Sequence, residues 1–479
     1  MRNHYPTLMA ASLGALLSSL AGCAIPAGKP AVQTNEVRVT YDASRRFQTI
    51  EGWGGGIPGW SEGDPDLLPR DAYHRHLPGL LDALTGDLGL NRFYLELYAT
   101  HVEPANDNDD PFKPDLRQFH VAGLEAMVRT VIVPLRQRVE ARGERFIFYV
   151  RCFAQGGRNG PRPNVLVENA DEYAELALVV LRKLRELGIA TDYWVLQNEP
   201  ELTREWEPGR LGLFAARLGA RMRAAGFATR IAGPETLAPD GVPKWLSAIA
   251  NTPGALAALG MITYHSYDYD PTLGQSPRLE PRRAVAALAS QLRLRVAQTE
   301  QGSGGRANPR RWDGTDFLLA LDLAENLWAD LTAANASAWE LHTLFGRRDP
   351  QGRWGGGKYL MISPDLAAIE RPVQYSTLRQ FTRFVRPGAV RVATEAAPGT
   401  TRVRVAAFLS PEGKPVAVLF HRDTSPVSLR ISGLPPGEYS IAITSRTEQG
   451  AERAVPPLGR GESLRLELPG EAILTLWMK

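Results

Sequence analysis

The stretch ADEYAELALVVLRKLRELGIATDYWVLQNEP, residues 170–200, contains one complete unit of the fold. Its first part, 170–187, places apolar side chains at helical spacing on one face: Tyr173, Leu176, Ala177, Val180, Leu181 and Leu184. Gly188 follows, and glycine is the residue type that most readily takes the left-handed conformation at a helix end. The run 191–197 is short and β-rich, so this stretch predicts a helix, a turn and a strand.

The same unit recurs along the chain. We expect strands at 49–53, 91–98, 145–153, 191–197, 230–233, 261–267, 294–299 and 336–342, and helices at 121–141, 170–187, 211–225 and 315–334. Strands that alternate with helices lie parallel, and eight such units close a (β/α)8 barrel. A doubly wound open sheet is the alternative, but it usually has a nucleotide-binding turn after its first strand. Here the first run continues into WGGGIP, residues 53–58, which opens no helix, so the barrel is favoured.

The pattern changes after about residue 390. Apolar and polar residues then alternate in runs at 390–394, 401–409, 415–421, 427–431, 438–444, 463–468 and 472–478. Turn signals separate these runs, as is typical of an antiparallel β-sandwich. The predicted fold is therefore α/β: a (β/α)8 TIM barrel at 46–388 with an associated antiparallel β-sandwich at 389–479. An N-terminal strand at 37–45 is expected to join the sandwich.

The composition excludes several classes of protein. Of the 479 residues, 44% are hydrophobic and 22% charged, so the chain is neither disordered nor fibrous. The formal net charge is +3 without a concentrated basic stripe, which argues against a nucleic-acid partner. Two Cys cannot form a multi-thiolate metal site, and no His-Glu-x-x-His motif occurs. No metal or organic cofactor is expected.

The first residues are typical of an export signal. The apolar run 8–20 is too short to span a bilayer. The sequence LAGC, residues 20–23, resembles the lipobox of bacterial lipoproteins, which implies a signal peptide at 1–22 and lipidation of Cys23. Residues 23–36 would then be a tether on an exported protein, held to a bacterial membrane (outer membrane or cell surface) by its N-terminal lipid only; plain secretion is the alternative. Cys152 is expected to be a free buried thiol.

Two of the expected strands end in a carboxylate. Glu199 follows Asn198 at the end of the fourth strand, and Glu300 ends the seventh. Barrel enzymes carry their chemistry at the C-terminal ends of strands, so we expect the two side chains to converge. A single Glu at a strand end is more often a solvated loop residue, but a converging pair favours glycoside hydrolysis. Asn198 could donate its amide to a sugar 2-hydroxyl.

Other strand ends carry groups that suit a sugar. Arg92, placed at the end of the second strand, is expected to hold Glu300 ionised, since an opposite charge within about 4–6 Å lowers a carboxylate pKa. His265 and Tyr267 end the sixth strand. Trp339 ends the eighth, where its ring could form the floor of a sugar site. Taken one at a time, such residues are more often core or ion-pair material.

These residues carry a resemblance to a known family. QTIEGWGGG, residues 48–56, resembles the first-strand signature of family 30 glycoside hydrolases, Gln-x-Ile-x-Gly-Phe-Gly-Gly, with Trp53 in place of Phe. Asn198-Glu199-Pro200 is similar to the Asn-Glu-Pro of the clan A retaining hydrolases, and Thr299-Glu300 resembles their nucleophile segment. The family's strand-two arginine, strand-six His-x-Tyr and strand-eight tryptophan fall on Arg92, His265, Tyr267 and Trp339.

The resemblance implies a retaining mechanism. Glu300 would attack the anomeric carbon while Glu199 protonates the departing oxygen, with the carboxyls about 5–5.5 Å apart. The implied substrate is an oligo- or polysaccharide with β-glycosidic bonds. Aromatic candidates for contact with it are Trp53, Trp60, Tyr94, Trp206, Tyr267 and Trp312. A noncatalytic surface glycan-binding lipoprotein on the same scaffold is the alternative.

Overall fold

The computed structural model describes residues 36–59, 68–154, 168–269, 275–302, 317–348, 358–396 and 403–479. The expected signal peptide, the lipidation site at Cys23, and Trp60 and Trp312 lie outside these residues. None of the helices in the described ranges has both the length and the apolar character needed to cross a membrane.

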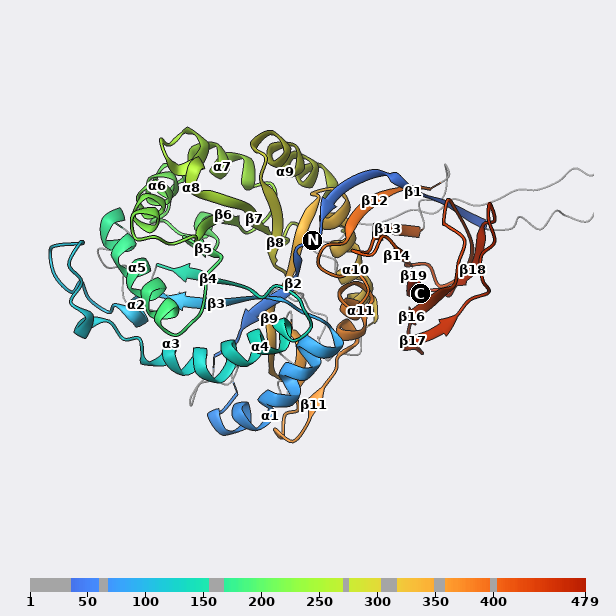
Figure 1. The fold of residues 1–479 in the computed structure, drawn as a ribbon, viewed down its shortest axis with the longest axis horizontal. Coiled ribbons are helices and arrows are strands. Elements are labelled where there is room, and N and C mark those ends of the chain that lie inside the picture. Colours follow the sequence, from blue (N-terminus) through green and yellow to red (C-terminus); the bar gives the residue numbers. More distant parts are fainter. Residues whose placement is uncertain are drawn as a thin grey trace, which may run out of the picture. The chain divides into compact units, whose positions relative to one another are not determined.

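Eight parallel strands form a closed ring (Figure 1). They are β2 (Gly52–Ile57), β3 (Arg92–Tyr98), β4 (Ile147–Phe153), β5 (Tyr193–Val195), β6 (Arg230–Thr236), β7 (Leu259–His265), β8 (Arg295–Glu300) and β9 (Ala336–Arg347). β9 pairs with both β8 and β2, which closes the ring. The predicted barrel is confirmed and the open-sheet alternative is excluded. β10 (Lys358–Ile362) and β11 (Ile369–Glu370), which the sequence did not indicate, extend the sheet beyond β9.

Helices follow the strands along the chain. The α-helices are α1 (Arg70–Asp82), α2 (Ala99–Val102), α3 (Ala122–Met127), α4 (Val133–Glu140), α5 (Ala170–Glu186), α6 (Pro208–Ala224), α7 (Val242–Asn251), α8 (Ala255–Ala258), α9 (Leu279–Leu292), α10 (Phe317–Thr332) and α11 (Val373–Thr382). Shorter π and 3-10 segments are η1 (Ala83–Asp87), η2 (Leu116–Gln118), η3 (Val128–Ile132) and η5 (Pro200–Leu202). The four helices expected from the sequence correspond to α3–η3–α4, α5, α6 and α10. Gly188, just beyond α5, has φ +78°, the left-handed conformation expected there.

The barrel strands separate two apolar layers. A small inner cluster fills the barrel: Tyr94, Ile147, Tyr149, Tyr193, Val195, Ala232, Met261, Ala297 and Ala338. Successive side chains on a strand point to opposite faces. Trp53 and Trp339 accordingly belong to the larger core cluster that also contains the helix side chains. This alternation decides which residues can reach the barrel mouth.

A nine-stranded sheet forms the second part of the fold. Its strands are β1 (Glu36–Thr49), β12 (Val390–Ala396), β13 (Val403–Leu409), β14 (Pro415–His421), β15 (Val427–Ser432), β16 (Tyr439–Thr444), β17 (Gln449–Ala454), β18 (Leu464–Leu468) and β19 (Ala472–Met478). β1 pairs antiparallel with β12 and parallel with β15, so the N-terminal strand joins this sheet as expected. β17 was not predicted, since its sequence QGAERA is polar and lacks β-formers.

Candidate active site

The structure brings Glu199 and Glu300 together at the C-terminal end of the barrel. Glu199 lies just beyond β5, and Glu300 is the last residue of β8. One carboxylate oxygen from each lies within 4.8 Å of the other and of a ring nitrogen of His265. The Glu199 side chain is 17% exposed and that of Glu300 is 9% exposed. Both carboxylates are therefore largely enclosed, and Glu199 is the more open to solvent.

His265, the last residue of β7, lies between carboxylates. Its Nδ1 is 2.9 Å from Oε1 of Glu199 and 3.9 Å from Oε1 of Glu300. Its Nε2 is 3.3 Å from Oε1 of Glu235. Burial lowers the pKa of His265, but the charge of Glu300 and the hydrogen bonds to Glu199 and Glu235 outweigh burial and raise the pKa to about 10. The ring is thus an imidazolium at neutral pH, with both N–H groups facing carboxylates.

The Glu300 carboxylate is held by groups that favour its ionised form. Arg151 donates to Oε2, and the Tyr267 hydroxyl donates to Oε1 at 3.0 Å. Burial raises the pKa of Glu300, but the charges of His265, His342 and Arg151 and the hydrogen bond from Tyr267 bring it down to about 2. Glu300 is therefore a fixed, ionised carboxylate at neutral pH.

Arg151 and Glu235 form a buried layer behind this pair. Nη2 of Arg151 lies 3.0 Å from Oε1 of Glu235, and it also donates to the backbone carbonyl of Thr299 at 2.7 Å. Burial raises the pKa of Glu235, but Arg151 and His265 outweigh it and the pKa falls below its usual value. The guanidinium stacks 3.8 Å over the ring of Tyr94. One arginine thus holds both Glu235 and Glu300.

The sequence analysis missed both members of this layer. Arg151 is a charged residue inside the otherwise apolar run of β4, and that mismatch is the signal that could have found it. Glu235 lies two residues beyond 233, where the fifth strand was expected to end, but β6 continues to Thr236. A longer strand estimate would have placed Glu235 at a strand end beside Glu199 and Glu300.

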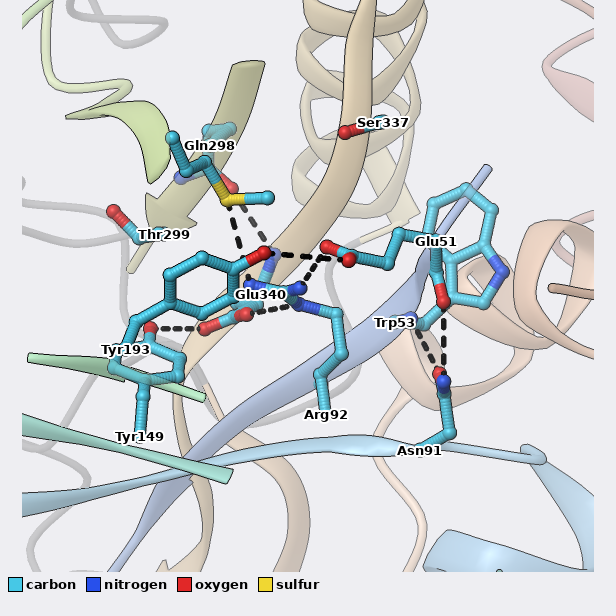
Figure 2. Close-up of polar contacts among 12 residues, drawn as sticks. Glu51, Trp53, Asn91, Arg92, Tyr149, Tyr193, Gln298, Thr299, Ser337 and Glu340 are labelled. Atoms are coloured by element: carbon cyan, nitrogen blue, oxygen red, sulfur yellow. Dashed lines mark hydrogen bonds and ion pairs between the residues drawn. The ribbon is translucent and has the colours of Figure 1, made fainter. Parts of the chain in front are cut away.

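The role expected for Arg92 is wrong. Arg92 is the first residue of β3, not its end, and its Nε donates to Oε1 of Glu340 at 2.7 Å. It also pairs with Glu51, as Figure 2 shows. Because a strand rises about 3.3 Å per residue, the start of a seven-residue strand lies at the opposite end of the barrel from Glu300. Arg92 stabilises the barrel floor, and Arg151 pairs with Glu300 instead.

The two tryptophans proposed to contact a sugar are also corrected. Trp53 and Trp339 are fully buried, so neither can form the floor of a sugar site. The Trp339 indole donates to Oδ2 of Asp330 on α10 at 3.0 Å, and the Trp53 indole donates to a backbone carbonyl at 2.6 Å. Figure 2 shows the Trp53 ring turned away from the charged groups around Arg92. On β9 the side chain near Glu300 is instead His342, which is 40% exposed.

The remaining candidates divide between site and core. Asn198 is 8% exposed, and its side-chain oxygen has no hydrogen-bond partner among the residues that the structure describes. Trp206 and Tyr94 are buried, and Trp206 packs edge-on against rings from α5 and α6, so both belong to the core. Of the aromatic candidates that the structure describes, Tyr267 is the one whose side chain donates a hydrogen bond to Glu300. Cys152 is a free buried thiol, as expected, and burial raises its pKa to about 12.

The arrangement suits proton transfer better than metal binding. Oxygen and nitrogen atoms of Glu199, His265 and Glu300 are close enough to share a cation, as are those of Glu96, Glu300 and His342. However, an imidazolium has no lone pair for a metal, and Glu300 already accepts from Arg151 and Tyr267. One ionised carboxylate facing a second, more open carboxylate is a geometry for acid–base and nucleophilic chemistry.

Known proteins resemble this chain in sequence and in fold. Residues 388–476 match the family model described as "Glycosyl hydrolase family 30 beta sandwich domain". A glucosylceramidase-like protein of Caenorhabditis elegans is 25% identical over 217 residues, which are 43% of this chain and 39% of that protein. The chain therefore matches well under half the length of that relative.

Solved structures share the fold at low identity. The catalytic domain of the GH30 xylanase C from Talaromyces cellulolyticus is 19% identical, with a TM-score of 0.68 over 92% of this chain and 100% of that chain. An endo-β-1,6-glucanase is 16% identical, with a TM-score of 0.64 over 94% of this chain and 95% of that chain.

The barrel with its attached sandwich is the fold that this chain shares with these two solved glycoside hydrolase structures. The match over residues 388–476 and the shared fold make the chain similar to glycoside hydrolases of family 30, which agrees with the resemblance drawn from the sequence.

Proposed function

We propose that the protein is a retaining glycoside hydrolase that cleaves β-glycosidic bonds in oligo- or polysaccharides by double displacement. The observation that carries this proposal is the ionised Glu300 carboxylate with Glu199 beside it, an oxygen of each within 4.8 Å of the other. Retaining enzymes hold their carboxyls about 5–5.5 Å apart, and a pair of oxygens within 4.8 Å is compatible with that spacing. Inverting enzymes hold their carboxyls about 6.5–9.5 Å apart to leave room for a water.

Glu300 is the nucleophile in the first step. One of its oxygens bonds to the anomeric carbon as the bond from that carbon to the leaving oxygen breaks. Arg151 and Tyr267 hold the two oxygens of Glu300, so the carboxylate is oriented before the substrate arrives. Glu199 gives its proton to the leaving oxygen.

The charges of the site support this division of roles. Glu235 and Glu300 are anions, and Arg151 and His265 are cations, so these four groups sum to zero. Once Glu300 is esterified, its negative charge is gone, and the two cations face one remaining anion. Glu199 then takes a proton from the incoming water, whose oxygen bonds to the anomeric carbon as the ester bond to Glu300 breaks.

Hydrolysis assays test the proposal. We expect the purified protein to hydrolyse aryl β-glycosides, and Glu199→Gln and Glu300→Gln to lower kcat/KM by about 10³-fold or more. Glu207→Gln, an exposed glutamate close to Glu199 in the sequence, is the matched control and should keep full activity. Equal activity in the wild type and both active-site variants would exclude the assignment. A folded protein that binds glycans without cleaving them would support the glycan-binding alternative.

The names of the similar proteins supply a first panel of substrates to test. Xylan, β-1,6-glucan and glucosylceramide are the substrates that their names suggest, and product sizes from each separate exo from endo action.

We also propose that the protein is exported and lipid-anchored through Cys23. The lipobox-like LAGC at 20–23 supports this. Incorporation of labelled fatty acid by the full chain in a bacterial host, lost in Cys23→Ser, is the expected result; unlabelled wild-type protein would favour plain secretion.

A further inference from the structure

A second group of carboxylates comes from the loop after α2 and from α5; Figure 1 labels these two helices. Glu172 and Glu175 are three residues apart on α5 and therefore share a face of the helix. Asp107 comes from the loop. One carboxylate oxygen from each of the three lies within 4.8 Å of the others. None of these residues belongs to the candidate active site.

Two of these carboxylates are buried without a protein partner. Glu175 is 1% exposed, and neither of its oxygens accepts a hydrogen bond from the residues that the structure describes. Glu172 is 3% exposed, and its Oε2 also accepts no hydrogen bond from the described residues. Burying an ionised carboxylate costs free energy unless a proton, a cation or hydrogen bonds neutralise it. A cation between the three residues would meet this requirement for Glu175, which is aimed at two other carboxylates.

The loop holds Asp107 so that one of its carboxylate oxygens is hydrogen-bonded and the other is left without a hydrogen-bond partner among the described residues. Oδ2 accepts hydrogen bonds from the side chain of Asn108 at 2.8 Å and from the backbone N–H of Asp115. Oδ1 is buried with no partner in the described part of the chain. The nearby cation, Arg221, donates to the backbone carbonyls of Asp171 at 2.7 Å and Pro111 at 2.6 Å. Arg221 thus links the loop to α5, and within the described part of the chain it donates no hydrogen bond to the three carboxylates.

The carboxylates are crowded. Glu103 is wholly buried, and its charge interacts with those of Asp107, Glu172 and Glu175. A cation bound between these groups would relieve the repulsion among them.

We propose that Asp107, Glu172 and Glu175, with Glu103 beside them, bind one calcium ion. A point between three oxygens 4.8 Å apart lies at most about 2.8 Å from each, so a small contraction reaches the about 2.3–2.6 Å of calcium–oxygen bonds. The donors are all oxygen, which selects a hard cation. Magnesium requires about 2.0–2.1 Å and a regular octahedron, and it retains waters, so an irregular set of buried carboxylates suits calcium. The ion would fasten the loop to α5 and takes no part in hydrolysis.

Thermal unfolding of the full chain tests the site. We expect 5 mM Ca²⁺ to raise the Tm by about 3 °C or more over EGTA at constant ionic strength, with Mg²⁺ giving a smaller rise. Glu175→Gln should abolish the Ca²⁺ response while keeping a Tm in EGTA equal to or above that of the wild type, because the substitution removes a repulsive charge. Glu186→Gln, at the far end of α5 and 65% exposed, is the matched control and should respond to Ca²⁺ like the wild type.

The outcomes distinguish calcium from protons. Titration calorimetry should show one Ca²⁺ site per chain, lost in Glu175→Gln. A wild-type Tm that ignores Ca²⁺ but rises as the pH falls from 8 to 6 would overturn the proposal, because protons would then be the occupants. A response that persists in Glu175→Gln, or that Mg²⁺ matches, would also overturn it.

Discussion

Replacing Arg151 with methionine tests the electrostatic design of the candidate active site. The substitution keeps an unbranched side chain that fills part of the same space but removes the cation shared by Glu235 and Glu300. An opposite charge at contact distance lowers a carboxylate pKa by about 1–3 units, and each unit corresponds to about 1.4 kcal/mol. We therefore expect the pKa of Glu300 to rise from about 2 by about 1–3 units.

The assay is the pH dependence of kcat/KM on the aryl β-glycoside that the wild type hydrolyses best. The acidic limb reports the ionisation of the nucleophile in the free enzyme, so in Arg151→Met it should move up by about 1–3 pH units. Removing one partner of a buried ion pair costs stability of about 3–5 kcal/mol, so the rates are measured at a temperature where circular dichroism shows the variant folded.

Two controls separate charge from packing. Arg151→Lys keeps the charge and should leave the acidic limb close to that of the wild type. Arg92→Met removes an equally buried arginine that pairs with Glu51 and Glu340, so it should lower stability without moving the limb. An unchanged acidic limb in Arg151→Met, or an equal shift in Arg92→Met, would refute the reasoning.

Three further predictions concern single side chains. Tyr267→Phe removes a charge-assisted hydrogen bond to Glu300, worth about 1.5–3 kcal/mol, and should lower kcat/KM by about 10- to 100-fold in steady-state assays; a change below threefold would contradict it. The pKa of His265 is raised in the folded state to about 10, so its stabilising contribution is full below about pH 6.5 and is lost as the pH rises toward 10. Denaturant unfolding should therefore show a smaller loss of stability between pH 6.5 and 10 in His265→Gln than in the wild type, and equal losses would count against the shift. Trp339→Phe should lower the Tm but leave KM unchanged, because the indole binds Asp330 in the core; a raised KM would restore the sugar-contact role.

The fold was predictable because its signals repeat. Each helix such as α5 shows one apolar face and a glycine stop, and each strand follows as a short β-rich run. Eight repetitions determine a barrel even when individual boundaries are wrong by up to five residues, as at the end of β9. The carboxylates of Glu199 and Glu300 were found for the same reason, since each ends a run and strand ends of a barrel meet at one mouth.

The errors come from the start, end and facing of individual strands. A shift of one residue moves a side chain from the barrel interior to the helix layer, which is why Trp339 faces Asp330 while its neighbour Ala338 faces inward. The role predicted for Arg92 was wrong because this residue starts its strand and was taken to end it. Glu235 was missed because β6 runs past Pro234, where a break was expected. These details depend on register between strands, which a single sequence does not contain.

The most direct measurement of the central claim is the anomeric configuration of the first product. Proton NMR spectra recorded in the first minutes of hydrolysis of an aryl β-glycoside distinguish the two anomers before mutarotation mixes them. A nucleophilic Glu300 with Glu199 as acid and base inverts the centre twice, so the β-anomer should appear first. Initial release of the α-anomer would show a single displacement by water and would contradict the role of Glu300.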